Sequence, residues 1–406
     1  MAAATLGRAI SDQAGAFDWI MLRAGSAREP WRRHLLPAMT HMPVTWRALA
    51  RVAGSVWRDA ATIRSHQYNH WIRSLLRARL KELKPDVIQL HSLHVAGWDF
   101  ELLACCQEFA PVVYTMHDFW HTTARCMFPY ECTQFESGCT ATCPTADQHP
   151  RLHRAEIHRE WLRRRRITSN SKRLVGVAVS DYIRRETLRG AWQSADVQVI
   201  RNGLNLRDDY KPMSSVEARK KLGLALDRPI FLISALSLED RRKGFSLLLE
   251  ALERIASSEF TILAFGNDNI GALTQRSNFR HLGYLSLESE KRLAYSAADW
   301  TVIPSLADNL PMVAVESIAC GTPVISFAVG GLPEVVIPGR SGILAGSPSA
   351  LSLADALGQA LQESPTSTSL RDSSRGVAEE LFDSRRSAGE YIQLYQQSIA
   401  RQTEHV

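Results

Sequence analysis

The sequence lacks any long hydrophobic run and any recognisable leader. Its most apolar stretch, residues 312–333, is interrupted by Glu316, Gly321 and Pro323, so it does not read as a membrane-spanning helix. The first residues contain no sustained apolar segment before an acidic one, which is a poor match to a signal peptide. We therefore expect a cytoplasmic protein, with the inner face of the membrane as a further hypothesis that rests on charge.

Three chemical patterns are also missing. No helix-turn-helix, RNP or zinc-finger pattern accompanies the basic residues, so we expect no nucleic acid as a partner. No Asp-x-Asp triplet occurs, so a catalytic divalent metal has no sequence support, and we expect no cofactor to be required for catalysis. No residue stands out as a covalent nucleophile.

Size and charge give the first positive signals. A chain of 406 residues exceeds what one hydrophobic core usually holds, so we expect two or more domains. Residues 1–200 carry 27 Lys and Arg against 18 Asp and Glu, a net +9, whereas the remainder carries 21 against 24, a net −3. The basic first half suggests an anionic partner, either a membrane surface or a pyrophosphate-bearing acceptor.

The most informative stretch is residues 305–334, SLADNLPMVAVESIACGTPVISFAVGGLPE. It follows an apolar segment, 299–304, that predicts a buried parallel strand. Apolar residues recur at helical spacing from Met312, and Gly321 with Pro323 ends that helix before another short strand. The turn between strand and helix therefore lies at the carboxyl end of a strand, where open α/β sheets bind ligands.

Two carboxylates mark this stretch, Asp308 in the turn and Glu316 on the helix. Unpaired backbone N–H groups at a helix N-terminus favour an anion such as phosphate, and Pro311 has no N–H to leave unpaired. These donors are expected at Asn309, Leu310 and Met312. Because a carboxylate accepts two hydroxyls at once, the combination suits a nucleotide-sugar. An acidic helix cap explains Asp308 alone equally well.

The whole stretch resembles the E-x7-E signature of retaining GT-B glycosyltransferases of family 4. The continuation ACGTPVISFAVGGLPEVV and the later residues 339–344 resemble that family too. The first signature position here is Asp308 instead of Glu, and an ADNLP version is similar to the branch that assembles exopolysaccharides of colanic-acid type. Aspartate has the shorter side chain, so its contact with the donor sugar is expected to differ.

The resemblance implies an α/β GT-B fold, in which two Rossmann-like domains turn their parallel sheets towards a cleft. We expect an acceptor-side domain over residues 1–203, a nucleotide-sugar-binding domain over 204–380, and a helix over 381–406 that crosses back to the first domain. Family members begin with a strand and a glycine-rich turn, which residues 1–22 do not match, so the N-terminal first strand is expected to be missing.

The resemblance also assigns roles to residues at predicted strand ends. His117 begins an HDFW motif and matches a family position near the reacting sugar, although a lone His is more often a hydrogen-bonded core residue; His91 ends the preceding predicted strand in the same way. Lys243 matches the family's Lys-Gly pair, and Arg242 is expected to add a second charge for the diphosphate. The implied catalytic residues are His117 and Asp308. The implied donor-binding residues are Arg242, Lys243, Gly266, Asn309, Leu310, Pro311, Met312 and Glu316.

A loop over residues 119–148 contains a cysteine cluster spaced C-x5-C-x6-C-x3-C. Four thiolates in one loop suit tetrahedral zinc, whereas reduced thiols or two disulfides are the alternatives. The hypothesis of a structural zinc site rests on Cys126, Cys132, Cys139 and Cys143. Cys105, Cys106 and Cys320 are expected to be ordinary buried residues.

Three further segments carry expectations about structure. Residues 149–167 predict a basic helix, which is either an ordinary solvated face or a surface for peripheral membrane contact. Residues 281–285 predict a strand, and the Ser-rich residues 364–374 predict a linker.

These observations predict a metal-independent glycosyltransferase of hexosyl type. It would move a sugar from a nucleoside-diphosphate sugar to a hydroxyl of a glycan or lipid-linked acceptor, with retention, in exopolysaccharide or cell-surface glycan assembly. One alternative is a GT-B nucleotide-sugar 2-epimerase. The other is a non-catalytic nucleotide-sugar-binding pseudo-enzyme, which Asp308 and the missing first strand both suggest.

Overall fold

The computed structural model describes most of the chain from residue 66 onwards. The described residues are 6, 9–10, 66–146, 150–169, 171–235, 240–255, 259–266, 271–363 and 368–403. They fall into two compact units: an N-terminal unit that holds 66–179, 183–199 and the residues from Tyr391 onwards, and a C-terminal unit that holds 180–182 and 200–390. The prediction of a missing first strand concerns residues 1–22, most of which lie outside the described part of the chain.

The N-terminal unit is built on a parallel sheet. Its described strands are β1 (Ile88–His91), β2 (Val112–Met116), β3 (Leu174–Ala178) and β4 (Asp196–Val199), in that spatial order. β2 and β3 are buried along their whole length, which explains why their sequences are almost continuously apolar instead of alternating. The register pairs His91 with Thr115, so β1 and β2 end side by side at one edge of the sheet.

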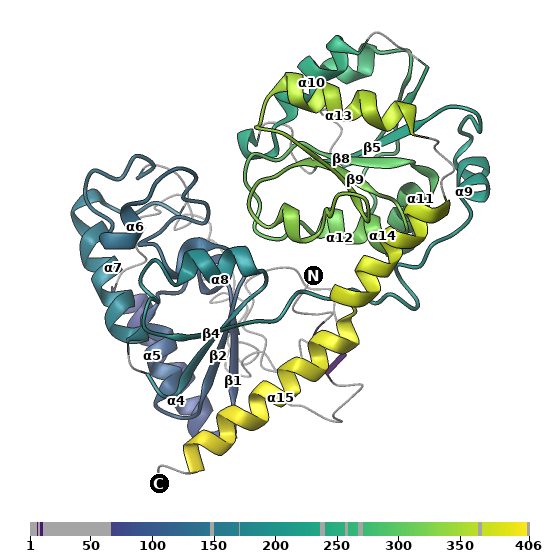
Figure 1. Cartoon of the computed structure of the whole chain (residues 1–406). Coiled ribbons are helices and arrows are strands. Elements are labelled where there is room, and N and C mark those ends of the chain that lie inside the picture. Colours follow the sequence, from purple (N-terminus) through teal and green to yellow (C-terminus); the bar gives the residue numbers. More distant parts are fainter. Residues whose placement is uncertain are drawn as a thin grey trace, which may run out of the picture. The chain divides into compact units, whose positions relative to one another are not determined.

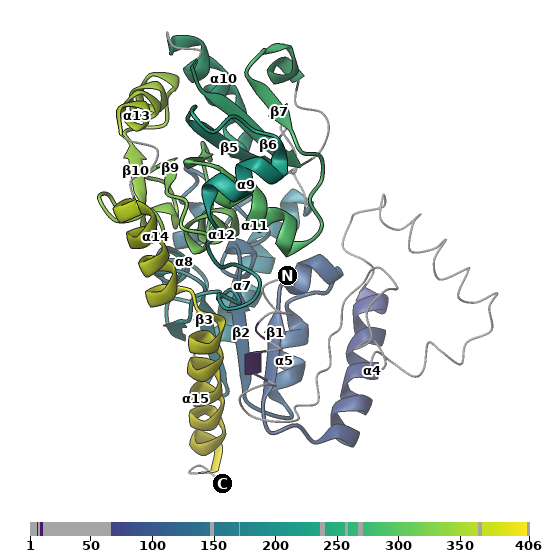
Figure 2. The same ribbon diagram turned by 90° about the vertical axis from the view of Figure 1, so that its right-hand side faces the viewer.

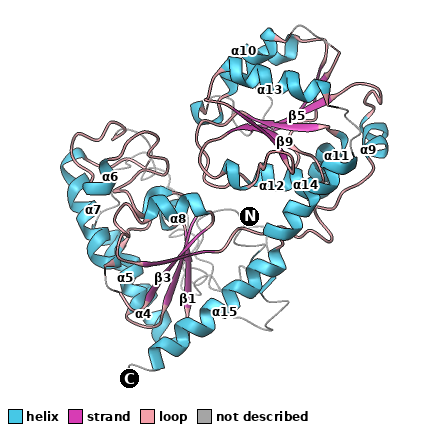
Figure 3. Cartoon of the chain, in the orientation of Figure 1, coloured by secondary structure: helices cyan, strands magenta, loops and turns pink. Residues whose placement is uncertain are grey.

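Helices pack around this sheet (Figure 3). They are α4 (His66–Leu83), α5 (Glu101–Gln107), α6 (Gln134–Ser137), α7 (Arg154–Thr168), α8 (Asp181–Thr187) and the later part of α15 (Ser384–Thr403). Figure 2 shows α4 alongside α5, and an ion pair between Arg77 and Glu108 (2.6 Å) joins α4 to the end of α5. Among the described residues, no helix is long and apolar enough to cross a membrane.

The C-terminal unit contains a larger parallel sheet. Its described strands are β5 (Ile230–Ala235), β6 (Thr261–Gly266), β7 (Phe279–His281), β8 (Trp300–Ile303), β9 (Val324–Phe327) and β10 (Gly342–Ala345). The spatial order is β10-β9-β8-β5-β6-β7. The first strand of this unit, β5, therefore lies in the middle, next to β8, and the chain winds outward on both sides of this pair. This is the strand order of a doubly wound Rossmann sheet.

Helices cover both faces of the C-terminal sheet (Figure 1). One face carries α10 (Phe245–Arg254) and α13 (Ala350–Gln362). The other carries α11 (Glu288–Ala297), α12 (Met312–Ala319) and α14 (Thr368–Leu381), with α9 (Ser215–Leu222) packed against α11. Side chains of β5, β8, α10 and α13 form one buried core that includes Phe231, Leu248, Trp300 and Leu357. Both units are thus Rossmann-like α/β layers with parallel sheets.

Two predictions about local structure were wrong. The Ser-rich segment 364–374 is not a linker throughout, because α14 begins at Thr368. Val377 and Ala378 are fully buried, and the guanidinium of Arg375 donates to the carbonyl oxygens of Leu206 and Tyr210 (2.9 and 2.6 Å), so packing and hydrogen bonds outweigh a polar composition. The strand expected at 281–285 ends at His281, because only 279–281 pair with β6.

Candidate functional site

The candidate site in the C-terminal unit lies where β5 and β8 end. Chains that leave these two neighbouring strands turn in opposite directions, towards β6 on one side and β9 on the other, so their loops diverge. Such a switch point leaves a crevice outside the carboxyl ends of the strands, which is where doubly wound sheets bind ligands. The loop after β5 contains Arg242 and Lys243, and the loop after β8 contains Asp308, so strand order alone brings the predicted residues together.

Lys243 and Asp308 form a direct ion pair. The Lys243 ammonium lies 2.8 Å from Asp308 Oδ2, and Arg242 Nη1 lies 3.6 Å from the same oxygen. Arg242 also pairs with Asp240 at 2.8 Å. The Asp308 side chain is 11% exposed and that of Lys243 34% exposed, so the pair is only partly screened by solvent. A diphosphate that binds here must draw Lys243 and Arg242 away from carboxylates that already neutralise them.

Backbone contacts fix the two loops against each other. Leu306 N–H donates to the carbonyl of Arg242 (2.7 Å). Gly244 has a φ of +63°, and a Cβ at this position would lie 1.9 Å from the carbonyl oxygen of Pro304, so only glycine lets the chains approach this closely. Gly330 allows an equally close approach to the Asp308 turn. Its φ is +59°, and a Cβ at this position would lie 1.8 Å from the carbonyl oxygen of Asp308.

A pocket opens at this strand edge, lined by residues that include Ser234, Lys243, Ser305 and Pro311. Gly266 ends β6 and pairs with Ala235 at the end of β5, so it lies at the same edge of the sheet. The pocket therefore extends from Lys243 to the start of α12 at Pro311.

The start of α12 departs in one respect from the sequence-based expectation. Asn309 N–H donates to Asp308 Oδ1 (3.0 Å), so this amide is engaged by the carboxylate instead of facing a ligand. Pro311 precedes the helix, and Leu310, which comes before it, is buried. Met312 is the first helical residue, so its N–H belongs to the first turn, where donors lack intrahelical partners.

Glu316 lies on α12 and is buried, as Asp308 is. It is 7% exposed, and its Oε2 accepts a hydrogen bond from the Tyr295 hydroxyl (2.9 Å) on α11. Burial raises the pKa of Glu316, whereas the Lys291 charge and the Tyr295 hydrogen bond oppose that rise. Burial and then the Glu316 charge raise the pKa of Tyr210, so its hydroxyl also lies within electrostatic reach. The carboxylate thus sits among polar groups, not in an apolar interior.

His117 belongs to a cluster of polar side chains in the N-terminal unit. It follows β2, and its Nε2 lies 3.0 Å from Nδ1 of His91, the last residue of β1. Burial lowers the pKa of His117 to about 4, and burial together with the nearby His117 lowers that of His91 to about 3. Next to them His94 Nε2 lies 3.1 Å from Asp118 Oδ2. Burial alone would raise the pKa of Asp118, but hydrogen bonding and the charge of His94 bring it below its usual value.

The cysteine loop shows no metal-binding geometry. All four predicted ligands are free thiols, with Cys139 and Cys143 buried and Cys126 and Cys132 partly exposed. Across the described residues, no three His, Cys, Asp or Glu side chains are grouped to hold a metal ion. Burial raises the pKa of Cys139 to about 11, which keeps this thiol protonated. Structural zinc stays a prediction that metal analysis of the purified protein would test. Cys105, Cys106 and Cys320 are buried as expected.

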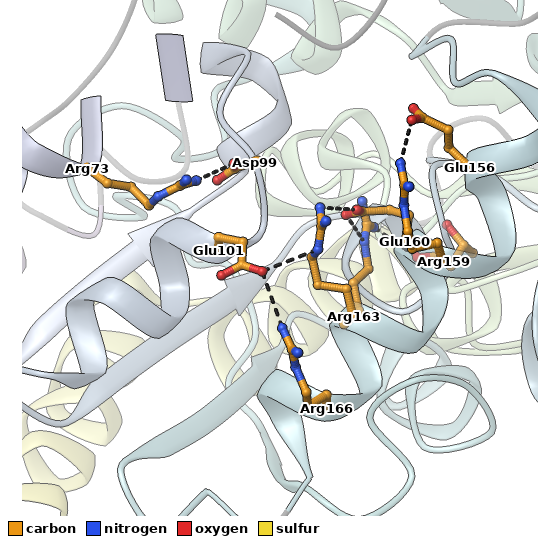
Figure 4. Close-up of polar contacts among 10 residues, drawn as sticks. Arg73, Asp99, Glu101, Glu156, Arg159, Glu160, Arg163 and Arg166 are labelled. Carbon is orange, nitrogen blue, oxygen red and sulfur yellow. Dashed lines mark hydrogen bonds and ion pairs between the residues drawn. The ribbon is translucent and has the colours of Figure 1, made fainter. Parts of the chain in front are cut away.

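The basic helix α7 uses its arginines within the N-terminal unit. Arg163 pairs with Glu160 and with Glu101 of α5, and Arg166 also pairs with Glu101 (Figure 4). Arg159 pairs with Glu156 one turn away. These cations therefore have carboxylate partners on the protein, which favours an ordinary ion-paired surface over a membrane-binding face.

Several residues of these clusters carry a sequence signal beyond the predicted site residues. Gln89 and His91 are two residues apart on β1, and Thr115 in β2 is two residues before His117, so each pair is expected to point to one face of the sheet. A polar residue two positions before a strand-end histidine is therefore the pattern that could have found them. Tyr295 had no such signal, because its partner Glu316 is distant in sequence and contact between α11 and α12 brings them together.

The two halves of the chain match two different family models. Residues 30–208 match the model described as Glycosyltransferase Family 4, and residues 215–377 match the model of glycosyl transferases group 1. The chain is 30% identical over 179 residues to a D-inositol 3-phosphate glycosyltransferase of Mycobacteroides abscessus, which covers 41% of this chain and 39% of that protein. It is 32% identical over 184 residues to an alpha-maltose-1-phosphate synthase of Mycolicibacterium smegmatis, covering 41% and 47%. The chain thus spans less than half of either relative.

Solved structures share the fold over much more of the chain. A sucrose-phosphate synthase from Thermosynechococcus elongatus matches with a TM-score of 0.62 and 24% identity, over 81% of this chain and 77% of that one. Anabaena Alr3699/HepE in complex with UDP matches with a TM-score of 0.60 and 17% identity, over 80% and 82%. The chain therefore has the GT-B fold, and its two halves are similar to Glycosyltransferase Family 4 and to glycosyl transferases group 1, respectively.

Proposed function

We propose that the chain is a glycosyltransferase that moves a sugar from a nucleoside-diphosphate sugar to an acceptor hydroxyl. The observation that carries the proposal is the meeting of Arg242, Lys243 and Asp308 at the switch point between β5 and β8, beside a pocket. Two cations at that edge suit a diphosphate, and a carboxylate next to them suits sugar hydroxyls. The two matched domain families are both glycosyltransferase families, which supports the same activity.

Each group has a distinct role in this reaction. Breaking the bond between sugar and diphosphate leaves negative charge on the departing diphosphate, and fixed cations stabilise that charge as it develops. We assign this role to Lys243 and Arg242, and the hydrogen bond between the two loops at Arg242 supports the assignment. Asp308 then exchanges its ion pair with Lys243 for hydroxyls of the donor sugar, and Glu316 accepts hydroxyls of the ribose. His117 polarises a hydroxyl of the donor sugar or acceptor.

The finer features of the reaction belong to the proposal as well. They are retention at the anomeric carbon, a hexose-type donor, catalysis that needs no metal, and a glycan or lipid-linked acceptor used in exopolysaccharide or cell-surface glycan assembly. The ADNLP turn around Asp308 supports the last of these. We place the reaction in the cytoplasm, and the basic first half of the chain is the one observation that supports a location at the inner face of the membrane. The named activities of the relatives and the UDP-glucose complex of Alr3699/HepE are consistent with a nucleotide-sugar donor.

A donor screen tests the proposal. Purified protein is mixed with UDP-, GDP- and dTDP-sugars, and its melting temperature and the release of free nucleotide are followed. One donor should raise the melting temperature and be hydrolysed slowly without an acceptor. Glu316→Ala should abolish the thermal shift, and an unchanged shift would contradict the assignment of Glu316. Epimerised UDP-sugar would support the epimerase alternative, and binding without nucleotide release the pseudo-enzyme.

A further inference from the structure

His91, which ends β1, and His117, which follows β2, are hydrogen-bonded to each other through their rings. His91 Nδ1 and His117 Nε2 lie 3.0 Å apart, and the ring centroids lie 5.3 Å apart with nearly parallel planes. Burial lowers the pKa of both rings far below 6.5, so each is neutral at physiological pH and carries one hydrogen. Only one of the two facing nitrogens can therefore hold the hydrogen of this bond.

The amide of Gln89 determines which of the two facing ring nitrogens carries the hydrogen. The amide nitrogen lies 3.1 Å from His91 Nε2 and 3.0 Å from Thr115 Oγ1. An amide nitrogen only donates, so His91 Nε2 must accept, and the single hydrogen of His91 is left on Nδ1. His91 Nδ1–H then donates to His117 Nε2, which in turn places the hydrogen of His117 on its Nδ1.

The orientation of the Gln89 amide is itself favoured by the surrounding groups. In the observed orientation both amide hydrogens reach acceptors, and the buried Oε1 is the one polar atom of the side chain without a partner among the described residues. The flipped orientation would bury two hydrogens without acceptors, which costs more than one unpaired oxygen. Thr115 Oγ1 is held in turn by the hydroxyl of Tyr391 on α15 (2.8 Å).

We propose that Gln89 and His91 are positioning residues that hold His117 in the tautomer with its hydrogen on Nδ1. In this tautomer the ring donates from Nδ1, and its Nε2 is occupied by His91 and cannot take a proton from a substrate. His117 therefore acts as a hydrogen-bond donor to an oxygen of the sugar or acceptor, not as a general base. This consequence for catalysis rests on the proposed function, whereas the tautomer does not.

Long-range ¹H–¹⁵N spectra of the full chain labelled with ¹⁵N-histidine test the tautomer. His117→Asn and His91→Asn variants assign the two rings. At pH 7.5 we expect His117 Nε2 to have the shift of an unprotonated nitrogen and Nδ1 that of a protonated one. Gln89→Met removes the donor at nearly the same size and should give a mixture of both tautomers for each ring. The exposed change Glu82→Gln serves as the matched control and should leave the spectrum unaltered.

Two results would overturn the proposal: a hydrogen on His117 Nε2 in the unchanged protein, or a His117 tautomer that Gln89→Met does not alter while circular dichroism shows a folded chain. If a donor is found, Gln89→Met should lower kcat at least about twofold, as the competent tautomer falls to about half of the population, with KM for the donor unchanged. If no donor is turned over, the proposed function fails, but the spectra still decide the tautomer.

Discussion

The two polar clusters of this chain differ in how they hold their charge. At the switch point of the C-terminal sheet, a partly exposed Lys243 and a largely buried Asp308 balance each other as an ion pair. At the edge of the N-terminal sheet, His91 and His117 are neutral because burial lowers the pKa of each ring. In the first cluster, the cations can exchange the Asp308 carboxylate for a bound diphosphate. In the second, the hydrogen bond between His91 and His117 keeps one hydrogen on a fixed ring nitrogen. Salt, charge removal and pH should therefore affect them differently.

Removal of the Lys243 charge should have the largest effect on nucleotide binding. Lys243→Met deletes the cation closest to Asp308 and leaves that carboxylate to repel a diphosphate, so we expect about a 100-fold loss of affinity for the nucleoside diphosphate, or about 2.7 kcal/mol. Isothermal titration calorimetry with UDP, GDP and dTDP measures it. Arg241→Met removes a neighbouring exposed cation and should change affinity by less than about threefold. Equal losses in both variants would show that only the general charge of the loop matters.

The close approach of the two loops gives a second test. Gly244→Ala would place a methyl group against the Pro304 carbonyl in a left-handed backbone, so we expect a loss of about 3 kcal/mol in unfolding free energy, or a displaced loop with weaker nucleotide binding. Gly223 has the same φ of +63° but no atom within 4 Å of an added Cβ. Gly223→Ala should therefore cost only the backbone strain, about 1 kcal/mol. Urea unfolding compares the two, and similar losses would remove the argument for contact.

Removal of the hydrogen bond between Tyr295 and Glu316 should lower both the stability of the fold and the affinity for the donor. Tyr295→Phe leaves the buried Glu316 Oε2 without its donor, and we expect a loss of about 1.5–2 kcal/mol in unfolding free energy. Because the carboxylate is no longer held in one orientation, donor affinity should fall as well. Tyr284→Phe alters an exposed tyrosine of the same unit and serves as the control. A destabilised Tyr295→Phe protein with unchanged donor affinity would separate Glu316 from the donor site.

The sequence was a better guide to the C-terminal cluster than to the N-terminal one for a physical reason. Arg242, Lys243 and Asp308 follow strands whose apolar runs are easy to recognise, and the strand order of a Rossmann sheet then places them together. The bond between Gln89 and His91 depends on register and side-chain direction, which composition does not reveal. Helix α14 escaped recognition because its stability comes from long-range contacts of Arg371 and Arg375 with carbonyl groups.

A fall in pH should change the stability of the two units in opposite directions. His91, His117 and His121 have folded pKa values lowered by burial to about 3, 4 and 3, so the unfolded chain takes up their protons first as pH falls below about 6.5. The N-terminal unit therefore loses stability between pH 6.5 and 4, by about 1.4 kcal/mol per independent histidine at pH 5.5. The lowered pKa of Asp118 adds to this loss at lower pH.

The C-terminal unit should respond in the opposite sense. Burial raises the pKa of Glu316 and Asp299 in the folded state, so the folded unit binds protons more readily and gains relative stability as pH falls towards those values. Hydrogen exchange of the full chain at pH 7.5 and 5.5, corrected for intrinsic rates, measures each unit by its own peptides. We expect protection to fall in β1 and β2 but not in β5 and β8. His91→Asn should reduce the loss, whereas the exposed change His153→Asn should not; a uniform loss in both units would mean that buried neutral histidines do not set the difference between them.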